Sequence, residues 1–297
     1  MTSKALIIGI NDYAPIGPGG PDLRGCVNDA RNIAHTLVST GVIPVSPLLP
    51  AMMRILTDSR ATRTAILEGF KWLIKGAHKG DTLIFFYSGH GSQIPDYNGD
   101  EMDRKDETIC PHDYATAGMI SDDDLRTMMQ ALPAGANLDV ILDSCHSGTG
   151  TRELEMLASS VEAEPEALTI RYIEPPLDYG YFLDVQPTLP IQRFLSPELT
   201  PTPKRAGKEK ELVPVRGLNH VLWAACRDYQ TAAETKIEGI YQGVFTYNYC
   251  KTLRRSGRAV TRLVLDSLVT NDIKAMGYGQ VPQLEASPES MLEKVFA

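Results

Sequence analysis

The feature that most constrains the fold is a series of short apolar runs separated by segments with helical periodicity. The run TLIFFY (Thr82–Tyr87) is almost wholly apolar, as expected of a strand buried on both faces of a parallel sheet. Apolar runs also occur within residues 4–12, 53–56 and 138–148, and amphipathic segments at 22–41, 57–77 and 121–132 separate these strands. This alternation predicts an α/β fold with a mostly parallel central sheet flanked by helices.

The pattern divides the chain into three parts. We expect residues 1–150 to form a large α/β part and residues 217–297 to complete the same domain with one strand and the helices at 243–255 and 261–276. Between them, residues 151–216 are rich in Pro, Glu, Ser and Thr and predict an exposed insert. Long loops of this kind are usually functional.

Composition excludes several classes of protein. A net charge of −8 argues against a nucleic-acid partner, and no apolar run is long enough to span a membrane. We expect no signal peptide, because the N-terminal apolar run is short and no cleavage pattern follows it. The five cysteines lack metal-ligand spacing and predict reduced thiols in the cytoplasm.

Two strands end in reactive side chains. His90 follows the strand in FFYSGHG, and Cys145 ends the strand in DVILDSC. Parallel strands deliver such residues to one edge of a sheet, so His90 can act as base toward a Cys145 nucleophile, with the Gly91 amide binding an oxyanion. Adjacent residues point apart, which disfavours His146 as the base. From this pair alone, a buried histidine and an inert cysteine are an equal alternative.

Several motifs occur together in register: ALIIGINDY, LRGCVNDA, YSGHG, GDEMDRKDETICPHDY, SDDDL, DSCHSG and WAACRDYQTAAE. With them the chain resembles the caspase-like cysteine peptidases of the metacaspase and orthocaspase branch. The resemblance implies a caspase-like three-layer sandwich, a cysteine endopeptidase with His90 as base and Cys145 as nucleophile, and a monomer. No third catalytic group is evident in the sequence.

The resemblance also implies a substrate pocket that takes the Arg or Lys before the cleaved bond. The matching residues are Cys26, Asp29, Ser88 and Asp143. Two carboxylates suit this task because they can bind a guanidinium with fixed geometry. We expect no cleavage after Asp, because Arg24 does not match the R-x-G spacing of animal caspases. The expected partners are protein or peptide substrates with Arg or Lys at that position.

No cofactor is needed for the chemistry, but the resemblance implies calcium as an activator. The matching ligands are Asp106, Asp122 and Asp123, whereas Arg152 replaces the fourth ligand of the family. An EF-hand between Asp96 and Glu107 is excluded because Glu101 stands where that loop requires glycine.

The insert contains basic residues that such an enzyme could cut. We expect processing at Lys204, Arg205, Lys208 or Lys210, with Arg152 and Arg171 as earlier alternatives. The agent would be the enzyme itself or an upstream protease. We expect no prodomain before the first strand, which would place regulation in this insert, in an ion or in a partner protein. The other functions considered are a non-catalytic scaffold and a calcium-responsive binding protein. A scaffold would need none of His90, Cys145, Asp29 and Asp143.

Overall fold

The structure is a computed structural model of the 297-residue chain. It describes residues 2–14, 21–45, 49–95, 105–145, 169–173, 219–227, 230 and 232–297. Within these ranges, none of the helices has the length and apolar character needed to cross a membrane.

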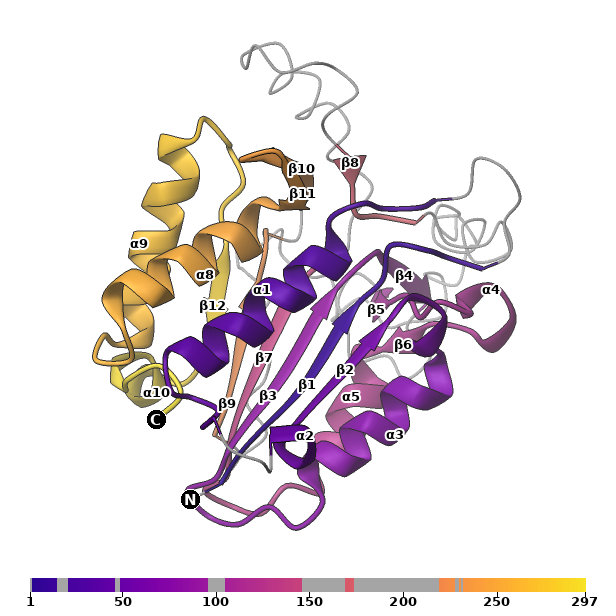
Figure 1. Cartoon of the computed structure of the whole chain (residues 1–297). Coiled ribbons are helices and arrows are strands. Elements are labelled where there is room, and N and C mark those ends of the chain that lie inside the picture. The colour runs from indigo at the N-terminus through magenta and orange to yellow at the C-terminus, as the bar shows by residue number, and fades with distance from the viewer. Residues whose placement is uncertain are drawn as a thin grey trace, which may run out of the picture.

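A six-stranded sheet forms the centre of the molecule (Figure 1). Its order is β12 (Gln283–Glu285), β9 (Asn219–Ala224), β7 (Asn137–Asp143), β3 (Thr82–Ser88), β1 (Ser3–Gly9) and β2 (Met53–Thr57). Five of the strands pair in parallel, and β12 is antiparallel to β9. The parallel strands therefore end at one common edge.

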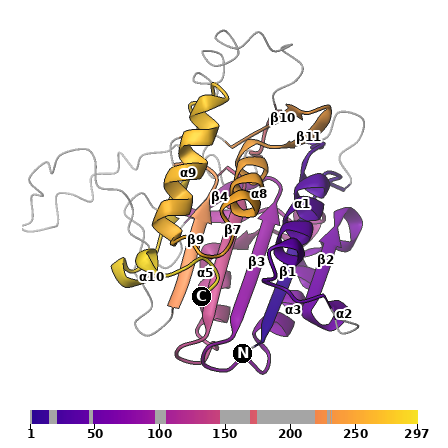
Figure 2. The ribbon, with the colours of Figure 1, turned by 60° about the vertical axis from the view of Figure 1, so that its left-hand side comes forward.

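Helices cover both faces of this sheet, as the two views show (Figures 1 and 2). One face carries α1 (Cys26–Ser39), α8 (Val244–Ser256) and α9 (Arg262–Ala275). The other carries α3 (Arg63–Ile74) and α5 (Asp122–Met129). Short helices complete the set: α2 (Leu49–Met52), the 3₁₀ helix η1 (Asp58–Arg60), α4 (Tyr114–Ala117) and α10 (Pro288–Leu292).

Side chains that alternate between the two faces of the sheet explain how one sheet contributes to two hydrophobic cores. All seven residues of β3 are buried, and successive side chains point to opposite faces. Ile84 and Phe86 pack in the core beneath α1 and α8, whereas Phe85 and Tyr87 pack in the core beneath α3 and α5. This arrangement is a three-layer α/β sandwich with a mostly parallel central sheet between helices, as the sequence predicts.

Two small sheets lie beyond the carboxyl ends of the central strands. One joins β4 (Gly91–Pro95), β5 (Lys105–Ile109) and β6 (Ile120–Ser121). The other joins β11 (Ile240–Gly243), β10 (Ala233–Ile237) and β8 (Thr169–Ile170). The sequence analysis did not predict these strands, and they surround the edge where His90 and Cys145 lie.

Candidate active site

The site is built at the carboxyl ends of β1, β3 and β7. Their register places Ser88 directly beside Asp143 and beside Gly9. The chain then leaves β3 toward His90 and leaves β7 toward Cys145. The parallel sheet thus brings both predicted reactive residues to one edge, as expected from the strand order.

An arginine from the predicted insert fills the pocket that was expected to hold a substrate. Arg171 is fully buried, and its guanidinium contacts Asp29 at 2.7 Å and Asp143 at 3.0 Å. Glu234 lies 3.4 Å away, and the Ser88 hydroxyl accepts a 2.8 Å hydrogen bond. Residues 169–173 therefore depart from the prediction that the insert is exposed, because their central side chain finds its charge partners inside the site.

Backbone donors hold the pocket carboxylates in place. The Gly243 amide donates to both oxygens of Asp29 at 2.9 and 3.1 Å. The amide and hydroxyl of Thr246, in the first turn of α8, donate to Asp143 at 3.1 and 2.6 Å. A helix N-terminus favours a negative charge, so α8 supports Asp143 both by contact and by its dipole.

Glu234 is the pocket residue that the sequence analysis missed. The amides of Arg24 and Gly25 donate to its carboxylate at 2.8 and 3.0 Å. Cys26 is buried beside it, with its sulfur 4.0 Å from a Glu234 oxygen. The Arg24 guanidinium is outside the pocket, stacked 5.2 Å from the centre of the Tyr241 ring.

The electrostatics of the pocket follow from burial and pairing. Burial raises the pKa of Asp29, and Arg171 opposes that rise. Burial alone would lower the pKa of Arg171, but the acidic groups around it, Asp143 foremost, raise that pKa well above its ordinary value. The raised pKa of Arg171 keeps its guanidinium charged, whereas the net rise of the Asp29 pKa to about 6 leaves that carboxyl ionised only above about this pH.

His90 is oriented by a backbone carbonyl that could not be predicted from the sequence pattern. Its Nε2 atom hydrogen-bonds the Pro21 carbonyl. A carbonyl only accepts, so a neutral imidazole must carry its proton on Nε2 and its lone pair on Nδ1. Within the described residues Nδ1 has no hydrogen-bond partner. Burial lowers the pKa of His90 to about 4, with the Pro21 carbonyl opposing the shift.

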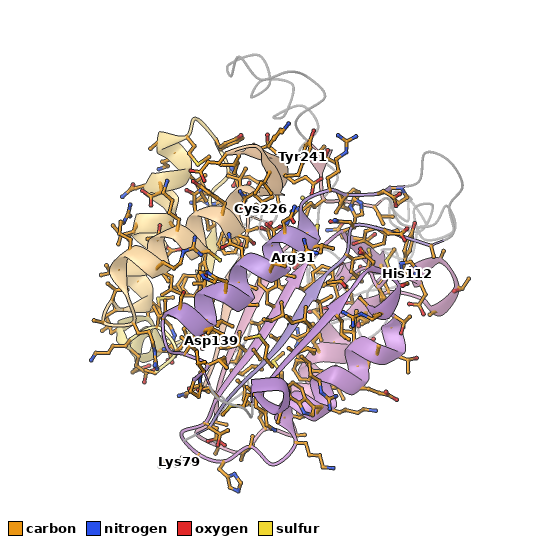
Figure 3. All side chains as sticks on the ribbon, viewed as in Figure 1. Arg31, Lys79, His112, Asp139, Cys226 and Tyr241 are labelled. Atoms are coloured by element: carbon orange, nitrogen blue, oxygen red, sulfur yellow. The ribbon has the colours of Figure 1, made fainter. Side chains whose placement is uncertain are left out.

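Cys145 is held by the chain just before β10. Its thiol donates to the Ala232 carbonyl at 3.2 Å and accepts from the Ala232 amide at 2.7 Å. Cys226 follows the neighbouring strand β9, and a hydrogen bond to Cys145 is the first cause of its raised pKa. Figure 3 shows Cys226 at the same end of the sheet as Tyr241 of β11, opposite the end marked by Lys79. All five cysteines are unpaired and buried.

Two amides converge on one carbonyl oxygen beside the thiol. The Gly91 amide donates to the Arg171 carbonyl at 3.0 Å, and the Cys145 amide donates to the same oxygen at 3.2 Å. Paired amides next to a nucleophile are the geometry that stabilises an oxyanion in acyl transfer. The arrangement can therefore position and polarise a peptide carbonyl next to a thiol and an imidazole.

The residues expected to bind calcium come from β5 and α5. Asp106 is on β5, and Asp122 and Asp123 begin α5, where they pair with Arg126 at 3.2 and 3.3 Å. Across the described residues, no group of three or more His, Cys, Asp or Glu side chains is arranged to hold a metal. Calcium binding at these residues stays a prediction.

Other predicted residues lie outside the described ranges. They are His146, Arg152 and the expected processing residues Lys204, Arg205, Lys208 and Lys210.

Comparisons with known proteins agree with this picture. A family model described as "Metacaspase, peptidase C14 domain" matches residues 3–152. Metacaspase-1 of Mycosarcoma maydis is 31% identical over 99% of this chain and 72% of its own length. Metacaspase-1 of Cryptococcus neoformans is 34% identical over 96% of this chain and 62% of its own length, and that of Coccidioides immitis is 34% identical over 96% and 61%.

The chain thus spans less than two thirds of two of these three relatives. A crystal structure of a Geobacter sulfurreducens protein covers 100% of this chain and 99% of its own, with a TM-score of 0.66 and 23% identity, which supports the fold. On the family match and on identities of 31% or more over nearly the whole of this chain, the chain belongs to the metacaspase family of cysteine-type peptidases.

Proposed function

We propose that this protein is an endopeptidase that cleaves proteins after Arg, and less well after Lys, with Cys145 as nucleophile and His90 as base. The observation that carries the proposal is the position of Arg171 in the site. Its guanidinium contacts Asp29 and Asp143, while its carbonyl accepts from the amides of Gly91 and Cys145. One arginine thus meets both a side-chain pocket and an oxyanion site.

The mechanism follows from these positions. His90 takes the Cys145 proton at Nδ1, and the sulfur attacks the carbonyl carbon of the Arg residue before the cleaved bond. The Gly91 and Cys145 amides bind the oxyanion. The imidazolium then protonates the leaving amine, and water hydrolyses the thioester. The Pro21 carbonyl keeps the imidazole in one tautomer and orientation.

The pocket geometry favours Arg over Lys. The two guanidinium Nη atoms of Arg171 each meet a separate carboxylate, Nη1 at Asp143 and Nη2 at Asp29. A lysine ammonium has a single nitrogen and cannot reproduce this pairing across a planar fork. An aspartate side chain would add a fourth carboxylate beside Asp29, Asp143 and Glu234, so cleavage after Asp is excluded by charge repulsion.

Two regulators expected from the sequence remain proposals. Calcium is retained as an activator to be tested, although Arg126 already pairs with Asp122 and Asp123. Processing of the insert, by the enzyme itself or by an upstream protease, is the second. No catalytic step requires a metal.

The test is hydrolysis of matched fluorogenic peptides ending in Arg, Lys or Asp, with calcium or with chelator. We expect the order Arg, then Lys, with no cleavage after Asp. Cys145→Ala should remove all turnover. Cleavage of the Arg peptide by Cys145→Ala, or preference for Asp, would refute the assignment.

A further inference from the structure

Residues 169–173 lie across the active site as a substrate would. We propose that the Arg171–Tyr172 peptide bond is the bond at which this enzyme cuts its own chain, and that the uncut segment is a built-in competitive inhibitor. This inference rests on the proposed function, and it names the first substrate of the enzyme and the way in which the enzyme is regulated.

The side of the segment that precedes the bond is bound by strand pairing. In the antiparallel pair of β8 with β10, Ile170 lies opposite Ala233 and Thr169 opposite Glu234. The Arg171 amide donates to the Ala232 carbonyl at 3.3 Å. Addition of an extended peptide to a sheet edge is a general way to bind peptides independently of sequence.

The side that follows the bond is also fixed. The Ile173 amide donates to the Gly91 carbonyl at 3.0 Å, and Gly91 forms a parallel bridge with Tyr172. Gly91 therefore holds both flanks of one peptide bond, since its own amide binds the Arg171 carbonyl. This fixes the carbonyl beside Cys145.

A purely structural arginine would not need this backbone arrangement. Pairing of its guanidinium with Asp29 and Asp143 would satisfy the buried charge wherever the Arg171 carbonyl pointed. Here the carbonyl is also bound by two amides, one of them from Cys145 itself. Because the Arg171 side chain is fully buried, an external substrate can enter the pocket only after the segment leaves.

The reaction is ordinary peptide hydrolysis. The Cys145 sulfur bonds to the Arg171 carbonyl carbon, and the bond from that carbon to the Tyr172 nitrogen breaks. His90 passes the thiol proton to the new amine. Water then releases the Arg171 carboxylate and restores the thiol. This cut creates a new N-terminus at Tyr172, which distinguishes it from cuts at the sites expected from the sequence, Lys204, Arg205, Lys208 and Lys210.

The experiment follows the purified full chain by intact mass and N-terminal sequencing, alongside hydrolysis of an Arg peptide. Three variants accompany the wild type: Cys145→Ala, Tyr172→Pro and its matched control Tyr172→Phe. A proline after the bond resists cleavage, and the two bridge hydrogen bonds use the Arg171 carbonyl and the Ile173 amide, not the Tyr172 amide. A fourth variant, Lys204→Gln with Arg205→Gln, removes two of the sites expected from the sequence. Circular dichroism checks that each variant folds.

We expect the wild type, Tyr172→Phe and the Lys204/Arg205 variant to yield a fragment that begins at position 172. Folded Tyr172→Pro should remain joined there and hydrolyse the Arg peptide at least ~10-fold more slowly than Tyr172→Phe. An active wild type that stays intact between Arg171 and Tyr172 would overturn the inference and leave the proposed function standing. Cutting of Cys145→Ala at that bond would also overturn it, by showing an outside protease. Loss of all peptide hydrolysis in the wild type would refute both.

Discussion

The three carboxylates around Arg171 differ in how directly they meet its guanidinium. Asp29 and Asp143 are within 3.0 Å, whereas Glu234 is 3.4 Å away and is also held by the amides of Arg24 and Gly25. A charged hydrogen bond contributes more to binding than a longer contact. The pocket therefore has two primary ligands for a guanidinium and one supporting charge.

Substitution at these residues should reveal that ranking. In the processed enzyme, Asp29→Asn should lower kcat/KM for an Arg peptide by roughly 10- to 100-fold, since a charged hydrogen bond contributes about 1.5–3 kcal/mol. Glu234→Gln should lower it by less than about 10-fold. Steady-state kinetics with Arg and Lys peptides measure both effects. Equal losses for the two variants would contradict the ranking.

The burial of His90 predicts a difference in pH dependence between self-cleavage and later turnover. Burial lowers its pKa to about 4 while the segment is in place. The base must be neutral, so protonation of His90 should not slow single-turnover self-cleavage until the pH approaches about 4. Once the segment leaves, water reaches the imidazole and its pKa rises toward the ordinary value of about 6.5. As the pH is lowered, the rate of peptide hydrolysis by the processed enzyme should therefore begin to fall at a higher pH than the rate of self-cleavage does. Two pH–rate profiles that coincide on the acidic side would contradict this reasoning.

Among the elements, the junction of β11 and α8 sets the shape of the pocket. Gly243 ends β11 and precedes the first turn of α8, which carries Thr246. A Cβ atom at position 243 would lie 2.2 Å from an Asp143 oxygen and 2.7 Å from an Arg171 nitrogen. The pocket therefore requires glycine for space.

Gly243→Ala should accordingly lose activity. Because a misplacement of about 1 Å can cost about 100-fold in rate, we expect a loss of kcat/KM of that order for Arg peptides, with overpacking lowering stability by about 1–3 kcal/mol. Ser256→Ala, at the other end of α8, serves as the control and should behave as the wild type. Kinetics and denaturant unfolding provide the measurements. Wild-type activity in Gly243→Ala would mean that Asp143 need not stay where the structure has it.

At the scale of the whole molecule, the periodicity of apolar residues explains which strands and helices could be predicted from the sequence. The buried strands at 82–88 and 137–143 and the helices at 244–256 and 262–275 agree with the patterns seen in the sequence, because each must bury one face or both. The position of Arg171 could not be predicted, since charge pairing with Asp29 and Asp143 joins parts of the chain far apart in sequence. The one local signal was TIRYI (Thr169–Ile173), a strand-like run around a basic residue.

The buried cluster of acids should make the stability of the folded molecule depend on a cation in the pocket. In the uncut chain Arg171 supplies that charge. In the processed chain a small guanidinium compound such as agmatine can take its place, and a ligand that binds only the folded state at 100 times its Kd adds about 2.7 kcal/mol. We therefore expect agmatine to raise the Tm of the processed enzyme and to leave the Tm of uncut Cys145→Ala unchanged. Processed Asp29→Asn is the control and should respond less, because it lacks one of the two primary carboxylates. An equal rise in the Tm of the uncut chain would mean that Arg171 does not block the pocket. Another part of the uncut chain would then have to exclude substrates.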